Sequence, residues 1–399
     1  MLFISLMLLI VSSLAACSEP ELVITPTVNS HTTVEITRET AVSLSPSMAI
    51  PIWQTRLSDA VNVTPMVWNG RVFVATADGT VHALDAATGQ KIWELRPENG
   101  RLWDASLRVA KDKVCAGLEG GLITCVGAAN GQPLWTTELG IEVQSRPAIE
   151  DGILYVPTTW VGTGTPNDYE GQAALFALDA DSGDILWEAT TENYILRRPI
   201  VADNLVITGG TDLADEENES SSDYNSPNRI YAFDKTSGDI VWVHESDDGL
   251  IRWLIASDEV VAFAGRSEII QALNLADGEP VWNFGPSYWM QFPVLADGVF
   301  YLGTGDERFH ALDAASGNLL WETSIDLDSL NQIGQPLVFG GTIWLNAVTG
   351  DIYGLRMADG QQEAHLETGL SIRVGGALFE NLYIMGDAEG GLYAFEIGS

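Results

Sequence analysis

The chain has 399 residues, of which 46% are hydrophobic, so it contains enough apolar material for a packed globular fold. It carries 55 acidic residues against 19 lysines and arginines, which gives a formal net charge of −36 at pH 7. This charge excludes nucleic acid and an anionic membrane face as partners that are held by bulk electrostatic attraction.

The first seventeen residues have the features of an export signal. The apolar stretch from Leu2 to Ala16 is short for a transmembrane helix. Its end, Leu14–Cys17 (LAAC), resembles a bacterial lipobox, which implies a lipoprotein signal peptide over 1–17 and lipid on Cys17. No lysine or arginine precedes the apolar stretch, as a secretory signal normally has, so an ordinary cleaved signal or a membrane anchor stays open as an alternative.

Residues 18–50 are rich in serine, threonine, proline and glutamate and contain no repeat. This composition predicts a disordered tether. About thirty residues of flexible chain span on the order of 30 Å. The tether would let the rest of the protein work near a membrane without lying on it.

An eleven-residue pattern, Ala-x-Asp-x-x-Thr/Ser-Gly-x-x-x-Trp, then recurs along the chain. Such self-similarity at roughly forty residues is typical of a propeller or a solenoid. Within one repeat, four short apolar runs (65–68, 72–75, 81–85 and 91–93) are separated by glycine-containing turns. They predict four antiparallel strands, and no segment has the long apolar period of a helix.

The number of repeats predicts the number of blades. The motif begins at eight positions: Ala83, Cys125, Ala177, Ala232, Ala272, Ala311, Gly354 and Ala394. The last copy ends after its third strand, while residues 51–56 look like a fourth strand that lacks its first three. We therefore expect an all-β, eight-bladed β-propeller over 51–399, closed where residues 51–56 pair beside Leu392–Ile397.

The tryptophan that ends the motif is expected to fill the space between neighbouring sheets, because it offers a large apolar area with one N–H to satisfy. The predicted docking tryptophans are Trp53, Trp93, Trp135, Trp187, Trp242, Trp282 and Trp321. This motif resembles the tryptophan-docking motif of the PQQ-like repeat propellers, which include the quinoprotein alcohol dehydrogenases and the BamB family of outer-membrane assembly lipoproteins. The resemblance extends over about 51–399 and implies the fold more strongly than a function, since one fold hosts unrelated sites.

Few residues point to chemistry, and we expect no catalytic residue, no cofactor and no metal site. His82 and His310 occupy one repeat position and are predicted to be structural. The aspartates of the motif, Asp85, Asp179, Asp234 and Asp313, are expected to hold its turn by side-chain hydrogen bonds to the backbone.

After Cys17, only Cys115 and Cys125 remain. A three-residue loop at 119–121 would place them opposite each other on adjacent strands, so a disulfide is expected in an oxidising compartment. Two buried thiols are the alternative.

The predicted binding face surrounds the start of the first strands, which line the centre of a propeller. Arg146, Arg198 and Arg252 hold the position before the first strand in blades three, four and five, where blade two has Leu107. Two insertions, 160–172 and 209–228, are expected on the same face. The full predicted face consists of Arg146, Arg197, Arg198, Arg252, Trp253, Tyr288, Trp289, Trp103 and Arg373. Either it binds an anionic or protein partner, or the arginines pair with carboxylates of the chain itself.

Three functions are compatible with these features. The first is a lipid-anchored, non-enzymatic, monomeric interaction scaffold of the cell envelope. A resemblance to BamB implies an outer-membrane barrel assembly component as its partner, at the outer membrane facing the periplasm in a diderm host; in a monoderm host the protein would lie on the cell surface. The second is a binding module for a small anion or a polysaccharide. The third, a PQQ-dependent dehydrogenase, is opposed by the short chain and by the absence of adjacent cysteines.

Overall fold

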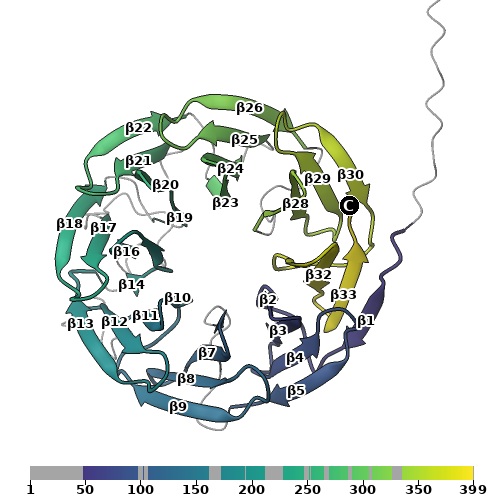
Figure 1. Cartoon of the computed structure of the whole chain (residues 1–399), viewed down its shortest axis with the longest axis horizontal. Coiled ribbons are helices and arrows are strands. Elements are labelled where there is room, and N and C mark those ends of the chain that lie inside the picture. The colour runs from purple at the N-terminus through teal and green to yellow at the C-terminus, as the bar shows by residue number, and fades with distance from the viewer. Residues whose placement is uncertain are drawn as a thin grey trace, which may run out of the picture. The chain divides into compact units, whose positions relative to one another are not determined.

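The computed structural model describes residues 48–97, 102, 107–160, 172–193, 195–211, 228–246, 251, 253–264, 269–285, 290–304, 308–325 and 335–398. These residues contain strands and turns and no helix. Residues from Pro46 onward form one compact unit. In it, eight antiparallel sheets surround a central axis, so the predicted eight-bladed β-propeller is confirmed (Figure 1).

Each blade has its first strand innermost and its last strand at the rim. Blade one contains β2 (Met66–Trp68), β3 (Arg71–Ala75), β4 (Val81–Asp85) and β5 (Lys91–Leu95). Blade two contains β6 (Arg108–Ala110), β7 (Lys113–Leu118), β8 (Leu122–Gly127) and β9 (Pro133–Glu138). Blade three contains β10 (Ala148–Glu150), β11 (Ile153–Pro157), β12 (Ala174–Asp179) and β13 (Ile185–Thr190). Blade four contains β14 (Ile195–Leu196), β15 (Ile200–Ala202), β16 (Leu205–Thr211), β17 (Asn228–Asp234) and β18 (Ile240–Ser246).

The second half of the ring repeats this order. Blade five contains β19 (Trp253–Ala256), β20 (Val260–Ala264), β21 (Ile270–Asn274) and β22 (Pro280–Phe284). Blade six contains β23 (Met290–Ala296), β24 (Val299–Thr304), β25 (Arg308–Asp313) and β26 (Leu319–Ser324). Blade seven contains β27 (Leu337–Phe339), β28 (Thr342–Asn346), β29 (Ile352–Arg356) and β30 (Gln362–Leu366). Blade eight contains β31 (Ala377–Phe379), β32 (Leu382–Gly386), β33 (Gly391–Glu396) and, as its outer strand, β1 (Trp53–Arg56).

Blade eight closes the ring by joining the two ends of the folded unit. In the antiparallel pair of β1 and β33, Trp53 lies opposite Ala394 and Arg56 lies opposite Gly391. This is the predicted closure. It covers the outer edge of β33, which would otherwise expose unpaired backbone groups.

The docking tryptophans join each blade to the next. The indole N–H of Trp53 donates to the Ala86 carbonyl of blade one at 3.0 Å, and that of Trp242 donates to the Leu275 carbonyl of blade five at 3.0 Å. The other five predicted tryptophans make the equivalent bond: Trp93, Trp135, Trp187, Trp282 and Trp321. Blade seven has Ala364 at this position, and a hydrogen bond from the Tyr383 hydroxyl to Asn346 at 2.8 Å joins it to blade eight.

The aspartates of the motif hold the turn that receives the tryptophan. Asp179 Oδ1 accepts the backbone N–H of Ser182 at 2.8 Å, and Asp234 Oδ1 accepts that of Ser237 at 2.9 Å. Asp85 and Asp313 make the same contact with Thr88 and Ser316. The predicted structural role of these carboxylates is confirmed.

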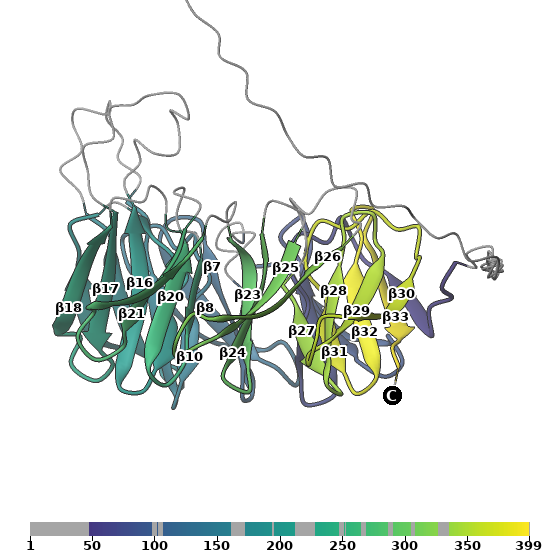
Figure 2. The same ribbon diagram turned by 90° about the horizontal axis from the view of Figure 1, so that it is seen from above.

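The strand order separates the connections of the ring onto two faces. Since the four strands of a blade alternate in direction, its first and third turns lie on one face, which we call the turn face. The second turn and the link to the next blade lie on the other, which we call the link face (Figure 2). Residues of a link form antiparallel bridges with residues just beyond the second strand of a blade: Val61 with Thr76, and Glu142 with Thr159.

Candidate functional site

Three arginines from three consecutive blades gather on the inner side of the ring. Arg146 and Arg198 each lie two residues before the inner strands β10 and β15, and Arg108 is the first residue of β6. Strand β10 packs against both β6 and β15. The proximity of the three side chains is also reflected in their mutual electrostatic repulsion. We call Arg108, Arg146 and Arg198 the arginine cluster.

The cluster is partly buried, and its three positive charges repel one another. Burial, followed by the charges of Arg198 and Arg108, lowers the pKa of Arg146 to about 9. Burial and the charge of Arg108 lower the pKa of Arg198 to about 10. Both values lie below the ordinary arginine pKa of 12.5, because burial and the neighbouring positive charges disfavour the charged guanidinium.

Within the described part of the chain, no ion pair or side-chain hydrogen bond involves these three arginines. Arg108 Nε is buried without a hydrogen-bond partner. Other basic residues do find carboxylates: Lys113 lies 2.6 Å from Asp181, and Arg308 lies 2.7 Å from Glu322. The alternative that the arginines serve as internal ion pairs therefore has no support among the described contacts of Arg146 and Arg198.

A cavity of about 260 Å³ adjoins the cluster at Arg198. Its wall comes from the inner strands of blades four to six and from Gln335, which precedes blade seven. Apart from Arg198, Trp253 and Gln335, it is lined by Ile200, Val201, Leu254, Ile255, Ala256, Pro293, Val294 and Leu295. The cavity therefore combines apolar walls with one guanidinium, one indole and one amide.

The structure gathers only part of the predicted binding face. Arg146, Arg198 and Trp253 lie in the sector described above. Arg197 is the neighbour of Arg198, but Arg373 is exposed on the link before β31, half a ring away in blade eight. The remaining predicted residues, Trp103, Arg252, Tyr288 and Trp289, lie outside the described residues.

Arg108 is the member of the cluster that the repeat alignment missed. That alignment placed Leu107 at the repeat position of Arg146. The strand pairing in the structure gives a different correspondence between blades two and three. Arg108 lies opposite Cys115, the third residue of the second strand in blade two, just as Ala148 lies opposite Tyr155 in blade three. Arg108 is therefore two positions further along its blade than Arg146, and side chains two apart share one face of a strand.

The strand that follows Arg108 is fixed by a disulfide. Cys115 on β7 lies opposite Cys125 on β8, and the structure joins them with their Cα atoms 4.1 Å apart. Both are buried. Because Arg108 pairs with Cys115, the disulfide holds the hairpin beside which the arginine cluster begins.

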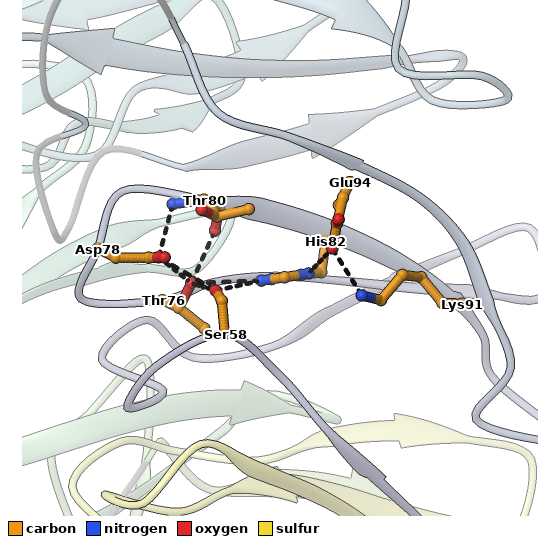
Figure 3. Close-up of polar contacts among 7 residues, drawn as sticks. All are labelled: Ser58, Thr76, Asp78, Thr80, His82, Lys91 and Glu94. Carbon is orange, nitrogen blue, oxygen red and sulfur yellow. Dashed lines mark hydrogen bonds and ion pairs between the residues drawn. The ribbon is translucent and has the colours of Figure 1, made fainter.

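A second group of polar residues surrounds His82 (Figure 3). It contains a serine, a histidine and a glutamate, as many hydrolase active sites do, but its distances indicate a structural role. His82 Nε2 lies 3.1 Å from Ser58 Oγ and 3.3 Å from Thr76 Oγ1. His82 Nδ1 lies 3.6 Å from Glu94 Oε2, which is too long for a hydrogen bond. Glu94 instead pairs with Lys91 at 2.6 Å.

The same arrangement recurs in blade six. His310 Nε2 lies 2.9 Å from Thr304 Oγ1, and His310 Nδ1 lies 3.8 Å from Glu322. A group that recurs at one repeat position, with its histidine fully buried in blade one, is better explained by packing than by access to a substrate. We therefore interpret His82 as a structural residue that connects the link carrying Ser58 to blade one.

Asp78 completes this group and gives it a pH dependence. Its Oδ1 accepts hydrogen bonds from Thr76 at 2.7 Å, from the backbone of Thr80 at 3.1 Å and from Ser58 at 3.2 Å. Burial raises the pKa of Asp78, but the bonds from Thr76, Thr80 and Ser58 outweigh it and lower the pKa to about 2.

Asp78→Asn is expected to cost less stability in acid than at neutral pH. Because the folded pKa is below the ordinary value of 3.8, the ionised carboxylate stabilises the fold above that value, and this contribution is lost as the pH falls toward 2. The free-energy difference between wild type and variant, measured by urea unfolding, should shrink by about 1 kcal/mol between pH 7 and pH 3. The exposed Asp59→Asn is the control. An equal difference at both pH values would contradict the role given to Asp78.

The described residues contain no group of three or more histidines, cysteines, aspartates or glutamates placed to hold a metal ion. Among the same residues, no helix is long and apolar enough to cross a membrane.

Comparison with known proteins shows which family the chain is similar to. The family described as "Outer membrane protein assembly factor BamB" matches residues 22–125, 119–283 and 265–398. BamB of Yersinia pestis is 24% identical over 86% of this chain and 77% of its own length. Polyvinylalcohol dehydrogenase of a Sphingopyxis species is 23% identical over 76% of this chain but only 53% of its own length. The crystal structure of BamB from Moraxella catarrhalis superposes with a TM-score of 0.64, at 18% identity, over 88% of this chain and 98% of that one.

Proposed function

Because the chain belongs to the BamB family of outer membrane protein assembly factors, we propose that it is a non-enzymatic scaffold of the cell envelope that assists outer-membrane protein assembly. The observation that carries the proposal is the extent of the family match, which runs from residue 22 to 398 and so includes every blade. A dehydrogenase relative is also similar, but this chain spans about half of its length.

We infer that the partner is a protein and that it binds the link face. This face bears the irregular connections of a rigid ring, which is where binding residues concentrate in proteins. It carries the exposed Arg373 and, at the inner rim, Arg197 and Trp253. Arginine and tryptophan are enriched in protein interfaces. In a chain of net charge −36, these basic side chains favour an acidic partner surface.

Photo-crosslinking in cells tests this proposal. A photoreactive amino acid at position 144 or 373, both on the link face, should give a specific protein adduct, whose mass identifies the partner. The same residue at position 358, in the exposed turn between β29 and β30 on the turn face, is the control and should give none. Equal adducts from all three positions, or none from 144 and 373, would overturn the choice of face.

Lipid anchoring at Cys17 belongs to the same proposal, although that residue lies outside the described part of the chain. The Cys17→Ser variant lacks the acceptor thiol and is expected to move from the membrane fraction to the soluble fraction. A variant that stays with the membrane would contradict anchoring at this cysteine.

A further inference from the structure

The arginine cluster has features of a binding site that the scaffold function does not require. The three side chains come from the first strand of blade two and from the residues just before β10 and β15, and they are partly buried. Removing a charged group from water is costly unless an opposite charge replaces the water. The chain has 55 acidic residues, yet none of the described ones pairs with Arg108, Arg146 or Arg198.

We propose that Arg108, Arg146 and Arg198 form a site for a small multivalent oxyanion, of the phosphate or polycarboxylate type. Each guanidinium presents a planar set of N–H donors that matches the oxygens of such an anion. Arg108 Nε, buried without a hydrogen-bond partner, is a donor that the bound anion would satisfy. Three positive charges match an anion with two or three negative charges.

The adjoining cavity sets the size of this ligand. It measures about 260 Å³, somewhat below the roughly 300–1,000 Å³ of pockets for drug-sized molecules. It is lined by Arg198 and by apolar side chains around Trp253, so it suits the compact body of a molecule whose charged group contacts the cluster. Trp253 borders both this cavity and the link face, but the partner crosslink is read at position 373, half a ring from Arg198, so the two proposals can fail independently.

The test uses the purified chain and two probes, inorganic phosphate and citrate, at constant ionic strength. Either probe should bind wild-type protein saturably in calorimetry and raise its melting temperature. Arg146→Met keeps the apolar stem but removes the charge, so it should weaken probe binding about tenfold or more. Arg198→Met should do the same and replaces Arg146→Met if that variant fails to fold.

A second readout distinguishes a ligand site from a structural one. Without ligand, Arg146→Met should melt at a higher temperature than wild type, because the variant removes a poorly solvated charge and its repulsion from two others. The control is Arg356→Met, since Arg356 is partly exposed on blade seven and pairs with Asp359 at 2.9 Å; it should leave probe binding unchanged. Failure of wild type to bind either probe, or undiminished binding by both cluster variants, would overturn the proposal. The partner crosslink from position 373 would be unaffected by either result.

Discussion

Replacing Trp242 by alanine is expected to destabilise the protein by about 3–5 kcal/mol. The indole is 7% exposed and packs in the junction between blades four and five. The substitution opens a cavity there and also leaves the Leu275 carbonyl without the 3.0 Å bond that it accepts. Urea unfolding at pH 7 measures the loss. Val241→Ala is the matched control, because Val241 is the preceding residue of β18 and is 49% exposed, so its truncation should cost little.

The contact between Trp242 and Gly278 makes this prediction sharper. A Cβ atom at Gly278 would lie 2.7 Å from the indole, and the φ of +73° at this residue strains any L side chain. Gly278→Ala should therefore cost about 2 kcal/mol or more in wild type. In the Trp242→Ala background only the backbone strain of about 1–2 kcal/mol should remain. Equal costs in both backgrounds would show that the ring does not lie against this glycine.

The strands of the blades could be predicted because the motif fixes their register. Residues 81–85, predicted as a third strand, are β4 with the same bounds. The reason is physical: the glycine of each turn accommodates the indole of the preceding blade, so turn, strand and tryptophan must keep a constant spacing. For Gly317, a Cβ atom would lie 2.5 Å from Trp282, which leaves little freedom for insertions inside the motif.

The arginine cluster was harder to predict, because the first strand of each blade lies outside the eleven-residue motif. Strand β6 has only three residues. It contains no glycine that contacts a docking tryptophan, so nothing in its sequence fixes how many residues separate it from the motif. Arg108 was missed because it stands two positions beyond the repeat position that Arg146 and Arg198 share. Arg373 shows the opposite error: it was assigned to the predicted face, but its place in blade eight puts it half a ring from Arg198. Proximity around a ring depends on blade number as well as on repeat position.

Removal of β1 is expected to open the ring. A chain beginning at Ser58 loses the pairing of Trp53–Arg56 with β33 and the docking of Trp53, which is 8% exposed, against blade one. Relative to a chain beginning at Pro46, the melting temperature should fall by about 10 °C or more. The uncovered edge of β33 should also produce concentration-dependent oligomers in size-exclusion chromatography with light scattering.

A peptide of residues 48–57 added to the chain that begins at Ser58 separates loss of closure from general damage. It can restore both the pairing with β33 and the indole contact, so it should raise the melting temperature and return the protein to a monomer. The same peptide with Trp53→Ala keeps most of the backbone pairing but lacks the 3.0 Å bond to the Ala86 carbonyl, and it should rescue far less. Equal rescue by both peptides would mean that strand pairing alone closes the ring. A stable monomer without any peptide would mean that seven complete blades suffice, and the composite blade would then have no role in closure.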